Sequence, residues 1–311
     1  MINLFSGTTS INLSNEVSNL LKIKLSEAEI IRFDNSELRV RILSDVKNNN
    51  AFVIQSGANP TDQSYIELFF FADALKRSGA NKIIAVIPYF GYARQNIQHR
   101  EGECVSEDII IKFLETSGYH EVIIFDIHAE ETLQNFSIPV KHLSAIGLLA
   151  EKIKSYLKEN IINPEKYVVV TPDEAGLTRA KRFSEVLFQN NKTEVAIIEK
   201  YRDLNKLHVS QAVKLIGDVK DKIAIIVDDI VTSGNTLINA SNMILKNGAK
   251  RVIAAIIHHD FSQTAPEKIQ NSSIDKFFTT NSIRLNKDQI FNKLEEVSIA
   301  KMLAAEIINV K

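Results

Sequence analysis

The 311-residue sequence contains a single cysteine, Cys104, which excludes an intrachain disulfide and a zinc site built from several cysteines. Its formal net charge is only −1 at pH 7, so composition gives no support to a nucleic acid or a membrane surface as the partner. Apolar runs such as residues 66–71 are too short to span a bilayer, and residues 1–7 lack the basic start and longer apolar core of a secretory signal. These absences predict a cytoplasmic protein that binds neither nucleic acid nor membrane.

The residues that are present favour an α/β fold. Hydrophobic residues make up 45% of the chain, and short β-branched runs alternate with longer helical patterns. Strands are expected at residues 51–55, 82–88, 121–126, 167–171, 194–198, 223–227 and 251–257, and helices at residues 64–78, 107–117 and 145–157. This alternation predicts mostly parallel sheets with helices on both faces. Two units fit better than one, the first over residues 1–143 and the second over residues 144–289.

The most informative stretch runs from Ile225 to Leu237. An apolar strand ends in Asp228 and Asp229, and a short loop with hydroxyl side chains and one glycine then leads into a helix. Ligands of open α/β sheets bind at the carboxyl ends of strands, where loop N–H groups and a helix N-terminus can hold an anion. The carboxylates suit the vicinal hydroxyls of a ribose, or a metal. The alternative is a strand, a turn and a capped helix whose acids are solvated.

This stretch resembles the phosphoribosyl-diphosphate-binding signature of type I phosphoribosyltransferases and of the diphosphokinases that make their substrate. Further blocks are similar to the ribose-phosphate pyrophosphokinase family in particular, and they lie in the family's order along the chain. They are Pro88–Gln95, Phe125–Glu131, Val168–Lys181, Glu199–Arg202, Ile216–Val219 and Val297–Ile308. On these blocks the chain is identified as a member of that family.

The resemblance implies two similar phosphoribosyltransferase-like domains, with a C-terminal helix at about residues 290–311 that packs back on the first domain. It implies a homo-oligomer, a dimer or a hexamer, whose ATP site takes residues from a neighbouring subunit. The implied reaction moves the β,γ-diphosphate of ATP onto the 1-hydroxyl of ribose 5-phosphate, and AMP leaves. Charge then spreads over phosphoryl oxygens, so catalysis depends on positioning and on cationic groups.

The resemblance also assigns roles residue by residue. The catalytic cations are Lys200 and Arg202, at the start of a polar segment that suits a mobile lid. Ribose 5-phosphate is held by Asp228, Asp229, Thr232, Ser233, Gly234, Asn235 and Thr236. ATP is held by Phe33, Asn35, Ser36, Glu37, Arg94 and Gln95. The cofactor is Mg²⁺, with metal contacts at His128 and Asp173. Taken alone, Phe33 reads as a core residue.

Several positions depart from the commoner family form. Asn35 and Ser36 stand where that form has Asp and Gly, and Thr232 and Asn235 stand where its phosphate loop has Asp and Gly. Basic residues are replaced in the stretch that follows Gln95, which in the bacterial type contributes to an allosteric anion site. We therefore expect weak or absent feedback by ADP at a separate site.

The cysteine and the other histidines are given structural interpretations. Cys104 is expected to be a small buried hydrophobic residue, and His258–Asp260 a solvated strand end that binds no metal. The histidines other than His128 carry no readable role.

Two other functions remain open on the sequence alone. The phosphate loop also fits a phosphoribosyltransferase that uses the diphosphate donor with a base. The departures at Asn35, Asn96 and Thr232 also fit a catalytically silent homologue that regulates an active partner. The blocks around Arg94, His128 and Lys200 favour the kinase over the first alternative, and the retained site residues favour it over the second.

Overall fold

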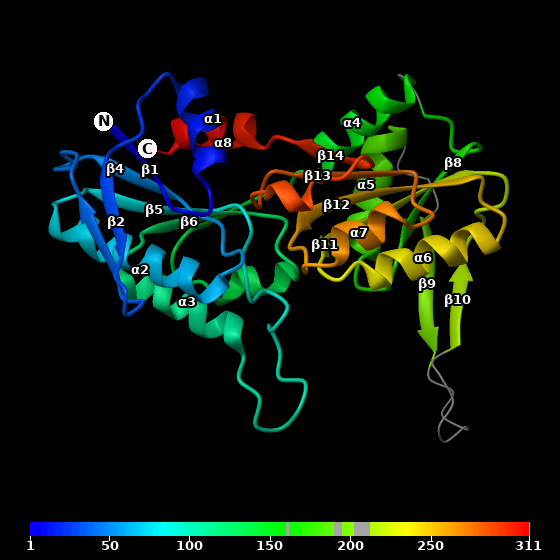
Figure 1. Cartoon of the computed structure of the whole chain (residues 1–311), viewed down its shortest axis with the longest axis horizontal. Coiled ribbons are helices and arrows are strands. Elements are labelled where there is room, and N and C mark those ends of the chain that lie inside the picture. The colour runs from blue at the N-terminus through cyan, green and yellow to red at the C-terminus, as the bar shows by residue number, and fades with distance from the viewer. Residues whose placement is uncertain (160–161, 190–194, 202–211, 311) are drawn as a thin grey trace. The chain divides into compact units, whose positions relative to one another are not determined.

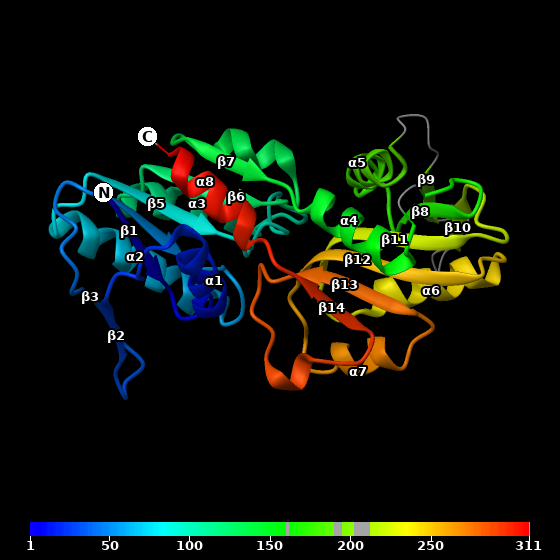
Figure 2. The same ribbon diagram turned by 90° about the horizontal axis from the view of Figure 1, so that it is seen from above.

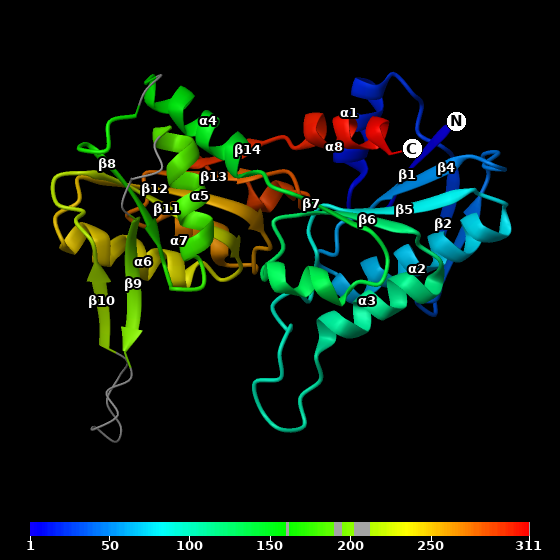
Figure 3. The same cartoon turned by 180° about the vertical axis from the view of Figure 1, so that it is seen from behind.

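The computed structural model describes residues 1–159, 162–189, 195–201 and 212–310. The chain divides into two compact units. Unit 1 contains Met1–Ser144, Ser282–Arg284 and Ser298–Lys311, and unit 2 contains Ala145–Asn281 and Leu285–Val297. Each unit has a mostly parallel β-sheet between layers of helices (Figure 1, and from behind in Figure 3). The predicted α/β fold class is therefore confirmed.

Unit 1 is built on a five-stranded parallel sheet with the strand order β1-β4-β5-β6-β7. These strands are β1 (Ile2–Ser6), β4 (Asn50–Ile54), β5 (Lys82–Ile87), β6 (Glu121–Phe125) and β7 (Val140–Leu143). One face is covered by α2 (Thr61–Arg77) and α3 (Ser106–Ser117), and the other by α1 (Ile11–Leu21) and α8 (Ala300–Asn309) (Figure 1). A short 3-10 helix, η1 (Glu130–Asn135), follows β6. Because both faces are covered, Ile83–Ile87 are fully buried.

The C-terminal helix α8 packs beside α1, although the two lie at opposite ends of the sequence. Ser298, just before α8, donates a 2.5 Å hydrogen bond to the Glu16 carboxylate of α1. Within α8, Glu306 forms a 3.4 Å ion pair with Lys141 of β7. Burial of Leu303 and Ile307 at 0% exposure supplies the apolar part of this contact.

A separate antiparallel hairpin in unit 1 is formed by β2 (Ala28–Arg32) and β3 (Leu38–Ile42). Alternate side chains on one side of it, from Ala28, Ile30, Val40 and Ile42, pack against the core of the unit. The tip, residues 33–37, is exposed. Figure 2 shows the hairpin projecting from the edge of the unit.

Unit 2 has a seven-stranded sheet with the order β10-β9-β8-β11-β12-β13-β14, in which only the β9–β10 pair is antiparallel. The strands are β8 (Tyr167–Thr171), β9 (Val195–Tyr201), β10 (Ala212–Ile216), β11 (Ile223–Val231), β12 (Arg251–His259), β13 (Lys276–Thr280) and β14 (Leu294–Val297). The helices α4 (Ile146–Leu157) and α5 (Leu177–Phe188) lie on one face, and α6 (Asn235–Lys246) and α7 (Ala265–Gln270) on the other (Figure 1). A 3-10 helix, η2 (Lys287–Gln289), precedes β14.

The register of unit 2 brings three strand ends to one edge of the sheet. Val170 of β8 is level with Ile226 of β11, and Thr171 is level with Ile197 of β9. Because these strands are parallel, their carboxyl ends lie at the same edge, where ligands of such sheets bind. In the part of the chain that the structure describes, no helix has the length and apolar character needed to cross a bilayer.

Candidate functional site

Two consecutive aspartates lie near the carboxyl end of β11. The sequence predicted that the strand would stop at Val227, but it continues to Val231, which pairs with His259 of β12. Asp228 is therefore half-buried and Asp229 is buried within the strand ladder. The alternative in which these acids are solvated after the strand is wrong.

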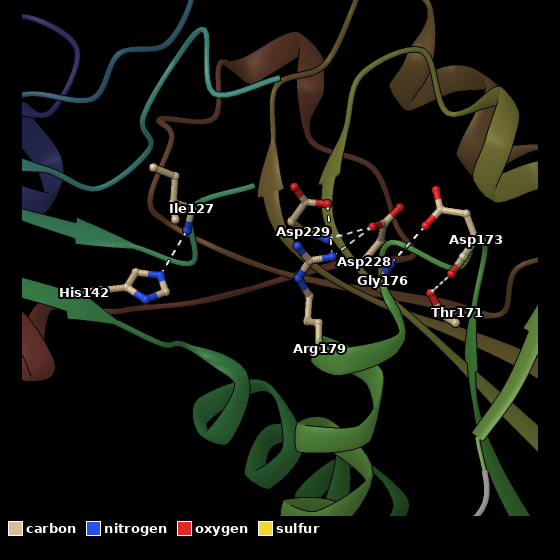
Figure 4. Close-up of polar contacts among 8 residues, drawn as sticks. All are labelled: Ile127, His142, Thr171, Asp173, Gly176, Arg179, Asp228 and Asp229. Carbon is tan, nitrogen blue, oxygen red and sulfur yellow. Dashed lines mark hydrogen bonds and ion pairs between the residues drawn. The ribbon is translucent and has the colours of Figure 1, made fainter. Parts of the chain in front are cut away.

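Arg179, in the first turn of α5, contacts both aspartates (Figure 4). Its Nη1 atom lies 3.4 Å from Asp228 Oδ1 and 3.3 Å from Asp229 Oδ1. The Asp229 backbone N–H donates to Asp228 Oδ1 over 2.9 Å. We call Arg179, Asp228 and Asp229 the aspartate–arginine cluster. The side chains of Arg179 and Asp229 are only 13% and 5% exposed, so the charges of the cluster are poorly screened by water.

The electrostatics of the cluster favour cationic neighbours. Burial raises the pKa of Asp228 well above its ordinary value, and the charge of Asp229 raises it further. Arg179 opposes this shift, whereas Asp173 adds to it. Adjacent carboxylates in a shielded position resist being charged together unless a cation compensates them. A cation bound near the cluster would therefore favour the ionised form of Asp228.

Asp173 lies in the turn between β8 and α5 (Figure 4). Its carboxylate Oδ1 accepts the Gly176 N–H over 3.0 Å, and its carbonyl accepts the Thr171 hydroxyl over 2.9 Å. A Cβ atom on Gly176 would lie 2.3 Å from Thr171 Oγ1, so the turn requires glycine at this position. The turn thus sets both the Asp173 carboxylate and the start of the helix that carries Arg179.

The loop predicted to hold phosphate follows β11 directly. Thr232 and Ser233 are half-buried, whereas Asn235 and Thr236 are exposed at the start of α6. Gly234 precedes the helix with φ +75°, a left-handed conformation that glycine adopts without strain. The Thr232 carbonyl is held by the Ser262 N–H over 3.1 Å. The first N–H groups of α6 and the loop hydroxyls therefore lie together at the carboxyl edge of the sheet.

Of the predicted catalytic cations, the structure places the backbone of Lys200. It lies in β9, three residues beyond Ile197, which is level with Thr171. Lys200 pairs with Val213 of β10. The carboxyl edge of one sheet therefore carries Lys200 together with Asp173 and Asp228. Arg202 lies outside the described residues.

The residues predicted for adenine lie at the tip of the β2–β3 hairpin in unit 1. The turn is closed by the Phe33 N–H, which donates to the Glu37 carbonyl over 2.8 Å, and the Asn35 carboxamide accepts the Glu37 N–H over 3.2 Å. Ser36 adopts φ +70°, where the commoner family form has glycine. The Phe33 ring is 44% exposed and lies 5.5 Å from the Arg39 guanidinium, so its alternative interpretation as a core residue is wrong.

The other predicted unit 1 residues follow β5 and β6. Arg94 and Gln95 are exposed after β5, and the Gln95 carboxamide oxygen accepts the Ser106 hydroxyl at the start of α3. His128 is exposed just after β6. The preceding Ile127 N–H donates to His142 Nε2 over 3.1 Å, which ties this segment to β7 (Figure 4). His142, for which the sequence indicated no readable role, thus supports the backbone beside His128.

Two further expectations were wrong. Cys104 is exposed instead of buried. His258 and His259 are 2% and 1% exposed, because β12 extends through both residues alongside the extended β11. Burial lowers the pKa of His259 to about 3, helped by His258 and opposed by the Thr280 backbone, so this imidazole is neutral. His120, for which the sequence indicated no readable role, accepts the Ile83 N–H at Nδ1 over 3.1 Å.

Arg179 was missed by the sequence analysis. It lies within the block Val168–Lys181, so a family resemblance pointed to the segment but not to this side chain. The residues in hydrogen-bond contact, Arg179 and Asp228, are separated by 49 positions, and no local pattern predicts their pairing. The only available signal was an arginine placed shortly after a strand-end turn.

The donor set at this edge fits a divalent, oxygen-preferring cation in part. Asp173 offers a half-buried carboxylate, and a cation bound beside it would oppose the effects that raise the pKa of Asp228. Magnesium is commonly held by one or two carboxylates together with substrate phosphates. Over the described ranges, no three His, Cys, Asp or Glu side chains gather as a metal cage. His128 offers an exposed imidazole nitrogen, a poorer match for magnesium than Asp173.

Both units of the chain match known protein families. Residues 2–118 match the family described as the N-terminal domain of ribose phosphate pyrophosphokinase, and residues 140–291 match the phosphoribosyl transferase domain. The ribose-phosphate pyrophosphokinase of Bacillus subtilis is 33% identical over 99% of this chain and 94% of its own length. That of Staphylococcus epidermidis is 34% identical over 99% of this chain and 93% of its own length. The crystal structure of phosphoribosylpyrophosphate synthetase from Mycobacterium smegmatis superposes with a TM-score of 0.90 at 30% identity, covering 99% of this chain and 97% of that one.

Proposed function

The chain belongs to the ribose-phosphate pyrophosphokinase family, and from this premise we propose how its residues make phosphoribosyl diphosphate. The reaction transfers the β,γ-diphosphate of ATP to the 1-hydroxyl of ribose 5-phosphate. An O–P bond forms at the β-phosphorus, the bond to the α-phosphate bridging oxygen breaks, and AMP leaves. The observation that carries the proposal is the carboxyl edge of unit 2, where Asp228 and Asp229 precede an anion-binding loop.

Unit 2 supports the sugar phosphate end of the site. Asp228 and Asp229 are proposed to accept hydrogen bonds from the ribose hydroxyls. The loop residues and the N-terminus of α6 are proposed to donate to the 5-phosphate, through Thr232, Ser233, Gly234, Asn235 and Thr236. With both ends of the sugar held, its 1-hydroxyl is restricted to one region of the edge, which lowers the entropy lost in reaching the transition state.

Lys200 and Arg202 are proposed to stabilise the negative charge that spreads over the transferring phosphoryl oxygens. The position of Lys200 near the carboxyl end of β9 supports this role, because that end belongs to the same sheet edge as Asp228. The positive charge of Lys200 and Arg202 would be worth most in the transition state, where the negative charge on these oxygens is developing. Their contribution is therefore to the rate of the chemical step.

The family uses ATP and generally needs a divalent metal, for which we propose Mg²⁺. When bound, it would supply positive charge that offsets the negative charge of the phosphate groups. In this chain Asp173 is the proposed protein ligand, and His128 is proposed to contact the metal or an ATP phosphate. The Gly176 N–H that holds the Asp173 carboxylate keeps one oxygen in place and leaves the acid oriented for this purpose.

For the nucleotide, Phe33, Asn35, Ser36 and Glu37 are proposed to bind adenine, and Arg94 with Gln95 to bind ATP phosphates. All of these side chains are exposed. We propose a homo-oligomer, a dimer or a hexamer, in which the hairpin tip of one copy completes the ATP site of a neighbour. We further propose domains at residues 1–143 and 144–289 and a cytoplasmic location.

The alternative functions are not favoured. The relatives that carry the pyrophosphokinase name match nearly the full chain, including the N-terminal domain that this family name describes. A phosphoribosyltransferase would consume phosphoribosyl diphosphate and a base, and a silent homologue would need an active partner. Neither alternative predicts AMP formation by the purified chain alone.

The direct test is an assay of AMP release by the purified chain with ATP, Mg²⁺ and ribose 5-phosphate, in the absence of any base. We expect equal amounts of AMP and phosphoribosyl diphosphate, with activity lost in Asp228→Asn. A chain that forms no AMP here, but releases diphosphate from phosphoribosyl diphosphate when a base is added, would be a phosphoribosyltransferase instead. Absence of both activities would favour the regulatory homologue.

A further inference from the structure

Arg179 has no role in the reaction outlined above, yet it contacts both aspartates proposed to hold the ribose. We propose that Arg179 is a positioning residue for ribose 5-phosphate, which fixes the Asp228 and Asp229 carboxylates in the orientation that accepts the ribose hydroxyls. This inference rests on the proposed function. It gives α5, the helix that carries Arg179, a part in binding ribose 5-phosphate.

The contacts define which carboxylate oxygens are used for positioning. Arg179 Nη1 approaches the Oδ1 atom of each aspartate, and Asp228 Oδ1 also accepts the Asp229 N–H. The orientation of the Asp228 carboxylate is therefore set by two donors, the Arg179 guanidinium and the Asp229 N–H, which share the Oδ1 atom. A ligand hydroxyl can then be accepted at Oδ2 without displacing either donor (Figure 4).

The charge of Arg179 matters as much as its geometry. Two adjacent carboxylates in a shielded site repel each other, and a protonated carboxyl no longer offers all its acceptor positions to a sugar hydroxyl. Arg179 lowers the pKa of Asp228 against the effects of burial and of Asp229. A neutral side chain at position 179 would leave the pair both less charged and less fixed.

Arg179 is itself largely buried beside the carboxylates. Its side chain is only 13% exposed, which argues for an indirect role and against direct contact with a substrate phosphate. Arg179 comes three residues after Gly176, which lies in a closely packed turn. A Cβ atom added at Gly176 would lie 2.3 Å from Thr171 Oγ1 and 3.7 Å from Arg179 Nη1. The helix that carries it packs against β8 and β11, the strands that bear Asp173 and the two aspartates at their ends. The guanidinium therefore has little freedom to move away.

The test compares Arg179→Met, Arg179→Lys and a matched control, Lys181→Met, in the full-length protein. Lys181 is an exposed cation on the same helix, so its removal changes the charge of α5 without touching the cluster. Steady-state kinetics would be measured for both substrates. Ribose 5-phosphate binding would be measured by calorimetry and thermal stability by unfolding.

For Arg179→Met we expect the KM and the Kd for ribose 5-phosphate to rise by about tenfold or more, with kcat and the KM for ATP within about threefold of wild type. Arg179→Lys should recover part of the affinity, because lysine keeps the charge but its side chain is shorter, so its ammonium cannot take the position of Nη1 beside both carboxylates. Lys181→Met should match the wild type.

An unchanged affinity for ribose 5-phosphate in Arg179→Met would overturn the proposal. So would equal losses for both substrates in the Met and Lys variants together with a lower Tm, since that pattern belongs to a purely structural residue. If Arg179→Met does not fold, affinity of Arg179→Lys equal to wild type would count against the proposal and a selective loss for ribose 5-phosphate would support it. A wild-type chain that binds ribose 5-phosphate but releases no AMP would refute the proposed function alone, and calorimetry would still test Arg179.

Discussion

The carboxyl group of Glu107 is a buried ionisable group whose effect on stability can be worked out in advance. Glu107 lies in the first turn of α3, has 0% exposure, and neither of its carboxyl oxygens has a hydrogen-bond partner among the described residues. Burial raises the pKa of Glu107 to about 7, and the charge of Asp108 adds to the shift, while Thr132 and His128 oppose it. The group is therefore protonated in the folded protein over a pH range in which it is ionised in the unfolded chain.

The sign of the stability change follows from this difference. Between pH 4.5 and about pH 7 the folded state binds more protons at Glu107 than the unfolded state, so stability falls as the pH rises through this window. Above pH 7 the full loss is present. A shift from 4.5 to about 7 corresponds to about 3 kcal/mol at 1.36 kcal/mol per pKa unit. Replacing Glu107 with neutral, isosteric Gln should remove this loss.

Thermal unfolding of Glu107→Gln and of the wild type, at equal protein concentration, would measure the effect at pH 5 and pH 8. At pH 8 we expect the variant to be more stable by about 3 kcal/mol, or roughly 6–12 °C in Tm for a unit of this size, and at pH 5 by less than about 1 kcal/mol. Glu101→Gln, at an exposed position just before α3, is the control and should change little at either pH. Equal stabilisation at both pH values, or none at pH 8, would refute the reasoning.

Three other predictions concern the site and the hairpin. Lys200→Ala should lower kcat by about a hundredfold or more and leave the circular dichroism spectrum unchanged, and near-normal turnover would exclude its catalytic role. Ser36→Gly should raise the free energy of unfolding by about 0.5–1 kcal/mol, because Ser36 has φ +70°, and a destabilised variant would contradict this. ADP titrated at saturating ATP should not inhibit strongly in a non-competitive way, since Ile97 and Gln98 stand where the commoner family form has basic residues.

The parts of the fold that could be predicted are those whose sequence pattern is local. The apolar run of β8 was predicted with its observed bounds, Tyr167–Thr171, and the prediction for β5 differed by one residue at its end. Such strands are covered on both faces and are therefore apolar throughout. The hairpin strands β2 and β3 were not predicted, because only alternate residues are packed and charged residues such as Arg39 occupy the exposed side. β14 was missed for a similar reason, with Glu295 and Glu296 in a four-residue strand.

The candidate site also has one part that a local sequence motif predicted and another part that it did not. Asp228, Asp229 and the loop that follows are contiguous, so one sequence motif located them together. The extension of β11 to Val231 was not predicted, because its support comes from pairing with His258 and His259 of β12, which the sequence analysis took for a solvated end. Tertiary pairing, not local propensity, decides where these strands stop.

The extended strand divides the proposed ribose 5-phosphate site into two parts that differ in how well they tolerate amino-acid substitution. Asp228 and Asp229 lie inside the strand ladder and are further fixed by Arg179, so the ribose end is set by rigid elements. The loop begins only after Val231, and its main donors to an anion are backbone N–H groups at the start of α6. Those donors do not depend on side-chain identity. Thr232 and Asn235 can therefore differ from the commoner family form without removing the anion site, whereas no backbone group could replace the carboxylates of the aspartates.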